Sequence, residues 1–337
     1  MKILVRATNW VGDAIMAIPT LRAIRTREPH AEITILARRW VSSLYEGQGL
    51  ADQLLVLEDL ADASATIRAQ HYNVAILLQN AFHAAWLAWR AGIPERIGYS
   101  RDGRSALLTR AISVPAAGEI PAHETYYYLE LLRRSGWLNQ LPEVGEIRLT
   151  ISPESRARAE NKIICAGARP ASRRIAIAPG AAYGSAKCWP PERFAELADG
   201  LIASFDADVI LFGAPSERDI AARITSGMRH RAVNLTGETP IEDLPAHFAA
   251  CDVFVGNDSG AMHVAAAAGV PVVAIFGSTD PDGTAPVTSR RTLVRVAPSC
   301  SPCFLRQCPV DHRCMTRIEV GLVDEAARRW LEQRGGA

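Results

Sequence analysis

Short apolar runs alternate along the chain with longer segments in which apolar residues recur every three or four positions. Runs of this length are typical of buried strands, and the longer period is typical of amphipathic helices. In the first half the pattern predicts strands at Lys2–Arg6, Glu32–Ala37, Leu54–Leu57 and Val74–Gln79, with helices at Ala14–Arg27, Val41–Gly47 and Leu60–Gln70. In the second half it predicts strands at Arg174–Pro179, Asp208–Gly213, Val253–Asn257 and Val272–Gly277, with helices at Pro191–Ser204, Ser216–Gly227, Ile241–Ala250, Gly260–Ala268 and Leu322–Gln333.

This alternation predicts an α/β fold whose parallel sheets are covered by helices on both faces. A chain of 337 residues is long for one compact unit and comfortable for two of about 150 residues each. A polar, arginine-rich stretch at Ala166–Arg174 separates the two series of elements. We therefore expect two Rossmann-like, doubly wound domains that face a cleft, at residues 1–165 and 166–320. A terminal helix within residues 321–337 could cross their junction.

Composition and charge argue against two classes of protein, those that bind nucleic acids and those that span a membrane. The net charge of +1 argues against a general nucleic-acid-binding protein, which usually carries a basic excess. The first residues carry charge before any apolar segment, and the most apolar stretch, Ala81–Ala91, is interrupted by His83 and Arg90. We expect no signal peptide, no transmembrane segment, a cytoplasmic location and reduced cysteines.

In parallel sheets, ligands bind beyond the carboxyl ends of the strands, so the loops after the strands are informative. The first such loop ends in Gly12 and Asp13 and lacks the G-x-G-x-x-G spacing of dinucleotide sites. Gly12 permits a tight turn. Asp13 is interpreted either as a helix cap or as a general base that activates a hydroxyl group.

The loop Pro179–Pro190 contains Gly180, Gly184 and one of only three lysines in the chain, Lys187. It follows a strand and precedes a helix that begins with two prolines, so backbone N–H groups and the lysine can face one ligand. The pattern predicts an anion site suited to a diphosphate, and its alternative is an ordinary strand-to-helix loop. It is not the Walker sequence.

Two further loops follow strands of the second half. Glu217 lies near a helix start, where its carboxylate either accepts from ribose hydroxyls or stabilises the helix dipole. Asp258, Ser259 and Gly260 precede a helix of small residues, which predicts a cap and a second anion site. His263 lies one turn into that helix and is either a ligand contact or a structural histidine.

Four cysteines near the end of the chain, Cys300, Cys303, Cys308 and Cys314, have a spacing that could hold zinc, although only one pair forms a C-x-x-C. Packed, reduced thiols are the favoured interpretation. Asp280-Pro281-Asp282 matches a metal-binding pattern, but the proline indicates a turn. No metal or cofactor is therefore expected.

Taken together, these loops resemble the bacterial heptosyltransferase family, which has the GT-B fold. The likeness extends over nearly the whole chain. It rests on Asn9–Met16, the Pro179–Pro190 loop, Asn257–His263 and the Cys300–Met315 segment. The first of these is similar to members that attach the second heptose, and the other three also fit those members.

The resemblance implies inverting transfer of L-glycero-D-manno-heptose from ADP-heptose to the first heptose of the lipopolysaccharide inner core. Residues 1–165 would bind the acceptor and residues 166–320 the nucleotide sugar. It implies that Asp13 is the general base, that Lys187 neutralises the departing ADP and that Glu217 holds the ribose. The resemblance places Gly12, Gly180, Tyr183, Gly184, Asp258, Ser259, Gly260 and His263 in the donor site.

The acceptor would be a lipid A–inner core molecule at the inner face of the inner membrane, where the protein could bind peripherally. Position in the chain suggests acceptor contacts at Asn9, Trp10, Arg101, Arg104 and His123. The sequence does not indicate an oligomeric state. The open alternatives are addition of the first heptose, another ADP-heptose-dependent transferase, a nucleotide-sugar epimerase and a non-catalytic nucleotide-sugar-binding protein.

Overall fold

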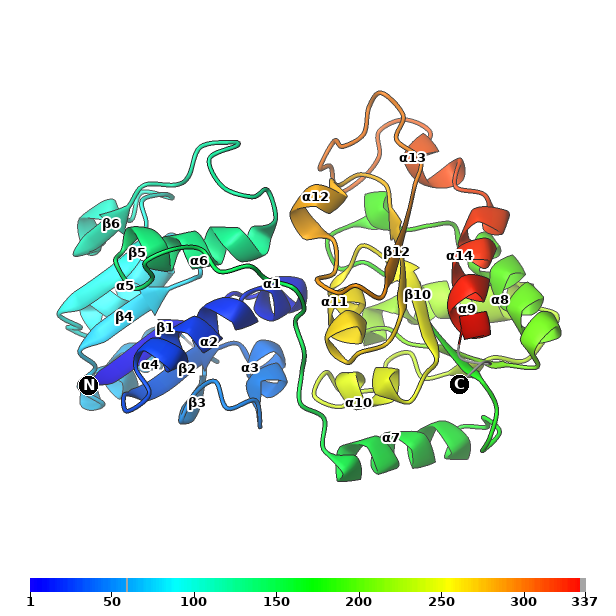
Figure 1. The fold of residues 1–337 in the computed structure, drawn as a ribbon, viewed down its shortest axis with the longest axis horizontal. Helices are drawn as coiled ribbons and strands as arrows, with labels where there is room; N and C mark the ends of the chain where they lie inside the picture. The colour runs from blue at the N-terminus through cyan, green and yellow to red at the C-terminus, as the bar shows by residue number, and fades with distance from the viewer. Residues whose placement is uncertain (59, 334–337) are drawn as a thin grey trace. The chain divides into compact units, whose positions relative to one another are not determined.

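The computed structural model describes residues 1–58 and 60–333 (Figure 1). The chain divides into two compact units, Met1–Ile147 and a second that begins at Arg148. Each unit contains one six-stranded parallel sheet. The predicted α/β class is therefore confirmed.

The first unit has the strand order β3-β2-β1-β4-β5-β6, the order of doubly wound dinucleotide-binding folds. Its direction of winding reverses between β1 and β4, which is the switch point where such folds bind ligands. The elements in chain order are β1 Lys2–Arg6, α1 Val11–Met16, α2 Ile18–Arg27, β2 Glu32–Ala37, α3 Arg39–Tyr45, β3 Gln53–Val56, α4 Leu60–Ala69, β4 Val74–Leu77, α5 Phe82–Arg90, β5 Glu95–Tyr99, a 3-10 turn Ser105–Leu107, β6 Arg110–Ile112 and α6 Glu124–Arg134.

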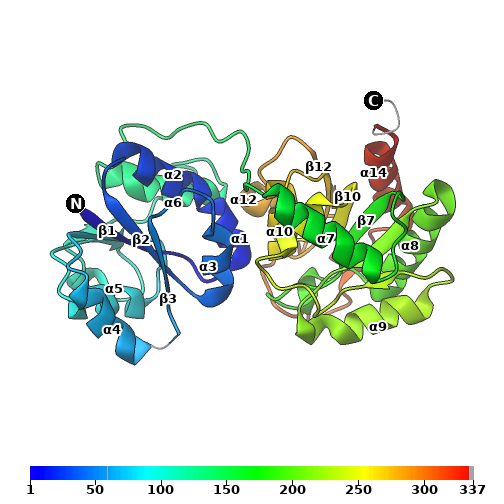
Figure 2. The same cartoon turned by 90° about the horizontal axis from the view of Figure 1, so that it is seen from below.

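The second unit repeats this topology, with the order β12-β11-β10-β7-β8-β9 and a switch point between β7 and β10. Figure 2 shows α7 lying alongside α10, and the two helices pack together. The elements are α7 Pro153–Cys165, β7 Arg174–Ala178, a 3-10 turn Ser185–Lys187, α8 Pro191–Phe205, β8 Asp208–Leu211, a 3-10 turn Pro215–Glu217, α9 Arg218–Gly227, β9 Val233–Asn234, α10 Leu244–Ala249, β10 Val253–Asn257, α11 Gly260–Ala267, β11 Val272–Phe276, α12 Pro281–Thr284, β12 Arg291–Arg295, α13 Arg313–Thr316 and α14 Val320–Gln333.

Both sheets are buried along their central strands. Residues Ile3, Leu4 and Val5 of β1 and all five residues of β7 and β10 are buried, because helices cover parallel sheets on both faces. The core of the second unit also includes Trp189, which stands edge-on to Phe194 with 4.9 Å between ring centroids. This packing fixes the start of α8 next to the sheet.

The helix predicted at Ala14–Arg27 is two helices, α1 and α2, separated at Ala17. Pro19 lies in the first turn of α2, and its missing N–H group interrupts the helical hydrogen-bond ladder. The helix α5 was not predicted. Its buried residues Ala84, Ala85, Leu87 and Ala88 have helical spacing, but exposed aromatic residues such as Trp89 make the segment apolar on its other face as well.

The contacts divide the chain after Ile147, earlier than the boundary predicted at residue 165, because α7 packs on α10 of the second unit. The predicted terminal helix exists as α14 and packs on α8 and on β10–β12. Residues 334–337 of its predicted segment lie outside the described residues, and its role at the junction stays a prediction. Among the described residues, no helix combines the length and apolar character needed to cross a bilayer.

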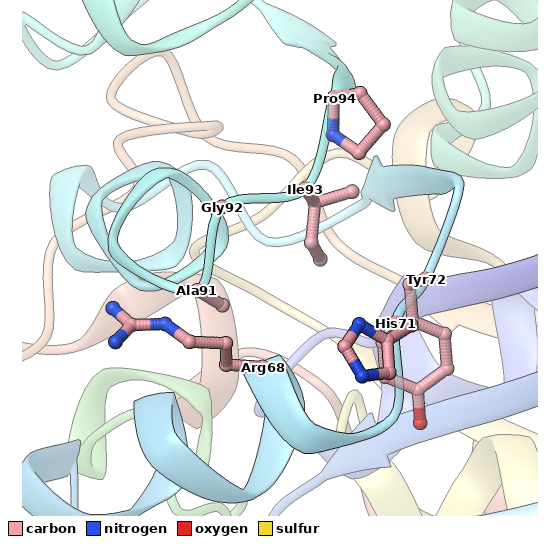
Figure 3. Close-up of a pocket in the computed structure, with 7 residues that line it drawn as sticks. All are labelled: Arg68, His71, Tyr72, Ala91, Gly92, Ile93 and Pro94. Carbon is pink, nitrogen blue, oxygen red and sulfur yellow. The ribbon is translucent and has the colours of Figure 1, made fainter.

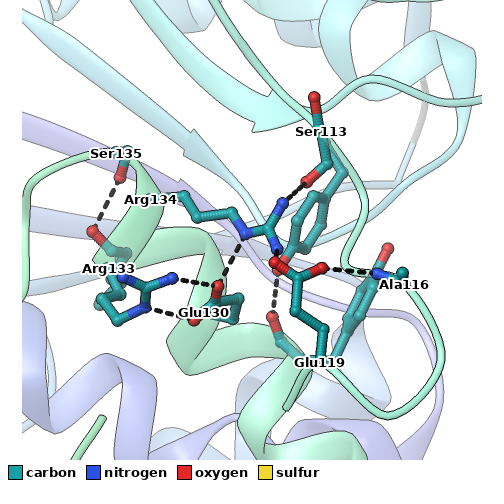
Figure 4. Close-up of polar contacts among 10 residues, drawn as sticks. Ser113, Ala116, Glu119, Glu130, Arg133, Arg134 and Ser135 are labelled. Carbon is teal, nitrogen blue, oxygen red and sulfur yellow. Dashed lines mark hydrogen bonds and ion pairs between the residues drawn. The ribbon is translucent and has the colours of Figure 1, made fainter. Parts of the chain in front are cut away.

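A polar cluster on α6 anchors the segment that precedes this helix (Figure 4). Glu130 is fully buried and accepts from Arg133 and Arg134 at 2.7 Å each. Arg134 also pairs with Glu119 and donates to the Ser113 carbonyl, which holds residues 113–119 against the helix. Hydrogen bonds from both arginines lower the pKa of Glu130, so this buried carboxyl stays charged and paired.

Candidate functional site

The loops predicted to bind the donor meet at the switch point of the second sheet. Strands β7 and β10 pair in parallel, with Ala178 opposite Gly256, so the loops after both strands emerge at the same edge. Open α/β sheets bind ligands at this position. The structure therefore brings the Pro179–Pro190 loop and the start of α11 together.

Lys187 and Asp258 form an ion pair at this edge, with 2.5 Å between Lys187 Nζ and Asp258 Oδ2. Their side chains are only 12% and 4% exposed. The Thr279 hydroxyl, which follows β11, donates to the same carboxylate oxygen at 2.6 Å. The lysine is thus held in place before any ligand binds. Sequence reasoning missed Thr279, because it carries no motif of its own.

Asn257 fixes the glycine-rich loop to the end of β10. Its side chain is fully buried, donates to the Pro179 carbonyl at 2.6 Å and accepts from the Trp189 backbone N–H at 3.0 Å. One amide group therefore holds both ends of the loop that carries Lys187. In the sequence, only the position of Asn257 directly before Asp258 pointed to a role for this residue at the site.

The aromatic ring of Tyr183 supports the lysine. Lys187 Nζ lies 4.9 Å from the ring centroid, within the range of a cation–π interaction. The Tyr183 hydroxyl donates to the Phe304 carbonyl at 2.7 Å, which joins the loop to the cysteine-rich segment. Gly184 is required here, because a Cβ atom at this position would overlap the Arg306 backbone.

Glu217 reaches over the end of β7. The Ala214 N–H donates to Glu217 Oε2 at 2.7 Å, and a Cβ atom on Gly180 would overlap the carboxylate. Burial raises the pKa of Glu217, with the hydrogen bond from Ala214 acting in the opposite direction. Gly180 is therefore needed to leave room for the partly buried Glu217 carboxylate beside the Pro179–Pro190 loop.

The start of α11 has unsatisfied polar groups. Ser259 occupies the N-cap position but makes no capping bond, contrary to the capping role expected for it or Asp258, and its hydroxyl is buried without a partner. The hydroxyls of Ser278 and Thr236, after β11 and β9, are likewise buried and unpartnered. Gly260 begins the helix, and His263 is buried one turn later. These hydroxyls can exchange hydrogen bonds with a further group at this edge.

Asp13 lies at the corresponding edge of the first sheet, in the first turn of α1, and is not the N-cap residue. Gly12 precedes it in the same turn. Helices α3 and α6 pack on α1 and bring Tyr45 and Tyr128 near Asp13. Burial, and then the negative charge of Asp13, raises the pKa of both phenols well above the ordinary value. Both tyrosines therefore stay protonated beside the aspartate.

The loop before Asp13 is held by one side chain from β1 and one from α3. The buried Arg6 donates to Asn9 Oδ1 at 2.7 Å, and Trp40 Nε1 donates to the Asn9 carbonyl at 2.9 Å. Trp10 is 50% exposed. Desolvation lowers the pKa of Arg6 to about 10, so this unusually buried arginine remains charged near neutral pH. Sequence reasoning did not identify Arg6 or Trp40.

The three remaining acceptor candidates differ in accessibility. Arg104 is fully buried and donates to the carbonyls of Tyr99 and Gln79 and to the Asn80 side chain, so its guanidinium group is a structural brace rather than an accessible acceptor contact. Arg101 is exposed, and a hydrogen bond with Tyr127 raises its pKa. His123 is the N-cap of α6 and accepts from the Thr125 N–H.

The cysteine-rich segment forms no disulfide, and no group of three or more histidine, cysteine, aspartate or glutamate side chains within residues 1–58 and 60–333 is arranged to hold a metal ion. Cys300 and Cys303 are exposed, whereas Cys314 is buried. Burial raises the pKa of Cys314, and the other three thiols add to this effect. Asp280 caps α12 by accepting from the Asp282 N–H, so Asp-Pro-Asp begins a short helix instead of the turn expected from the proline.

A hollow of about 300 Å³ lies in the first unit between the ends of α4 and α5 (Figure 3). Arg68, His71 and Tyr72 line one side, and residues 91–94 line the other. Both segments lead into the amino ends of β4 and β5, opposite the edge where parallel sheets bind ligands. The hollow is therefore separate from the candidate site.

Comparison with known proteins identifies the family of the chain. The family model for glycosyltransferase family 9 (heptosyltransferase) matches residues 62–313. Lipopolysaccharide heptosyltransferase 2 from Salmonella typhimurium is 31% identical, and its counterpart from Escherichia coli K12 is 30% identical, each with 88% of both chains covered. The solved structure of E. coli ADP-heptose lps heptosyltransferase II superposes with a TM-score of 0.85 and 28% identity, over 100% of both chains. The chain therefore belongs to glycosyltransferase family 9, the heptosyltransferase family, and is a glycosyltransferase.

Proposed function

We propose that this enzyme transfers heptose from ADP-heptose to the first heptose of the lipopolysaccharide inner core, as the names of the relatives described above suggest. The observation that carries the proposal is the Lys187–Asp258 pair at the switch point of the second sheet, within a chain of this family. This edge combines a buried cation with two helix starts, a combination that binds phosphate groups.

In the proposed donor complex, the diphosphate lies at Lys187 and the start of α11, and Glu217 accepts from the ribose hydroxyls. The unpartnered hydroxyls of Ser259 and Ser278 supply further donors at the same edge. Tyr183 and Gly184 shape the loop. His263 is buried in α11, so its proposed contribution is to support the helix start.

In the proposed reaction, an acceptor hydroxyl oxygen attacks the anomeric carbon, and its proton moves to Asp13. The bond from that carbon to the β-phosphate oxygen breaks, and its electron pair leaves with ADP. Inversion follows from this single displacement. A positioned base and stabilised charge on the leaving group each contribute to such a step.

Acceptor binding is proposed for the first unit, with Asn9, Trp10, Arg101 and His123 as contacts. The fixed Asn9 loop and the half-exposed Trp10 ring support this assignment. The acceptor is a lipid A–inner core molecule, so we propose that the enzyme works at the cytoplasmic face of the inner membrane.

The test is turnover of ADP-heptose with three defined acceptors that carry no heptose, one heptose or two. We expect transfer to the acceptor with one heptose. Preference for the acceptor without heptose would assign the first transfer instead. Conversion of the donor to a new sugar without acceptor would indicate an epimerase, and ADP binding without any transfer would indicate a binding protein.

A further inference from the structure

Asp258 compensates the charge of Lys187 within the protein itself. Asp258 lies 2.5 Å away and is held by Thr279, so the pair carries no net charge. Both phosphates of ADP-heptose are substituted on two oxygens, so each carries one negative charge at neutral pH and the diphosphate carries two. The donor site therefore needs a cation besides Lys187 to balance a diphosphate.

Arg306 lies beside the aromatic ring of Tyr183, as Lys187 does. Its Cζ atom is 5.3 Å from the centroid of the Tyr183 ring, while Lys187 Nζ is 4.9 Å from that centroid. One aromatic ring therefore carries two cations. A diphosphate presents oxygens on two phosphorus atoms and can contact both.

The backbone around Arg306 is fixed to the lysine loop by several contacts. The Ala186 N–H donates to the Arg306 carbonyl at 3.0 Å, and the Tyr183 hydroxyl donates to the neighbouring Phe304 carbonyl at 2.7 Å. His312 Nε2 lies 3.0 Å from the Ala186 carbonyl oxygen, to which an N–H group there donates. The Cys300–Met315 segment thus holds Arg306 against the Pro179–Pro190 loop, although the segment and the loop are far apart in the sequence.

The guanidinium group of Arg306 is exposed and lacks a carboxylate partner within the described part of the chain. Other arginines of the terminal segment are paired there, Arg295 with Asp280 and Arg313 with Asp311. An arginine held on an aromatic ring without an acidic partner is available to bind an anion.

We propose that Arg306 is a second cationic residue of the donor site and binds the β-phosphate of ADP-heptose beside Lys187. This inference rests on the proposed function. The guanidinium group donates hydrogen bonds to the β-phosphate oxygens. As the bond to the anomeric carbon breaks, the leaving ADP gains negative charge, and Arg306 stabilises that charge together with Lys187.

The experiment compares ADP and AMP binding to wild type, Arg306→Gln, Arg306→Lys and Arg313→Gln by calorimetry. ADP and AMP differ only in the β-phosphate. We expect Arg306→Gln to weaken ADP binding about tenfold and to leave AMP binding nearly unchanged. Arg306→Lys should be intermediate, because lysine keeps the charge and loses the planar fork.

Arg313→Gln is the matched control, since it removes the same charge from the same segment at a guanidinium group that faces Asp311. It should bind ADP like wild type. Equal ADP affinity in Arg306→Gln and wild type would overturn the inference, and the proposed function would survive if Lys187→Ala still lost ADP binding. Absence of ADP binding by wild type would overturn both.

Discussion

Lys187 and Asp258 lie 71 positions apart in the sequence and form a nearly buried ion pair at the carboxyl edge of the second sheet. The pair explains how a flexible lysine is oriented before the ligand arrives. It also means that an incoming diphosphate competes with Asp258 for the ammonium group. Thr279 donates a hydrogen bond to the same carboxylate oxygen and so holds Asp258 in position.

Breaking this pair should lower stability. We expect Lys187→Met and Asp258→Asn each to lower the free energy of unfolding by up to about 3 kcal/mol, because each leaves a partner buried without its counter-ion or strongest bond. The double variant should lose less than the two single effects added together. Urea unfolding of all four proteins measures this coupling, and purely additive losses would show that the pair contributes no interaction energy.

Asp13→Asn should lower turnover by about two to four orders of magnitude and leave ADP affinity unchanged, because the amide keeps the shape but cannot accept the proton. Steady-state transfer assays and calorimetry measure the two effects. Glu46→Gln is the control, since it alters an exposed carboxylate in the same unit. Full turnover by Asp13→Asn would remove this residue as the base.

Glu217 should make ADP binding depend on pH. Burial raises its pKa above the ordinary value of 4.5, and only the ionised carboxylate accepts from ribose hydroxyls. Donor affinity should therefore be full above the raised pKa and fall as the pH decreases through it. The phosphates of ADP titrate with wild type and Glu217→Gln alike, so the ratio of their dissociation constants isolates the residue. A ratio that is constant from about pH 7.5 down to about pH 4.5 would contradict this role.

The cysteines should differ in reactivity. Cys300 and Cys303 are exposed and should be alkylated first by iodoacetamide at about pH 8. Cys188 should react slowly, because burial raises the pKa of its thiol to about 11. Peptide mass spectrometry gives the order. Protection of Cys300 and Cys303, together with one equivalent of zinc that a chelator releases, would instead establish a metal site.

The sequence by itself determined the α/β class, the two series of strands and helices, and the loops that carry Asp13 and Lys187. These features are local. A buried parallel strand needs a continuous apolar run, and a loop that approaches a ligand needs glycine. Both can therefore be recognised from a few neighbouring residues. The helix α5 was harder to recognise, because exposed aromatic residues such as Trp89 make both of its faces apolar.

Only the tertiary structure decided which loops meet. The strand order places β7 beside β10 and so joins Lys187 to Asp258. It also buried Arg104, which sequence position suggested as an acceptor contact, and brought Arg306 to the Tyr183 ring. Such pairings depend on how the chain crosses over between strands. Local hydrophobic pattern does not encode that order, because every buried strand of a parallel sheet carries the same apolar signal.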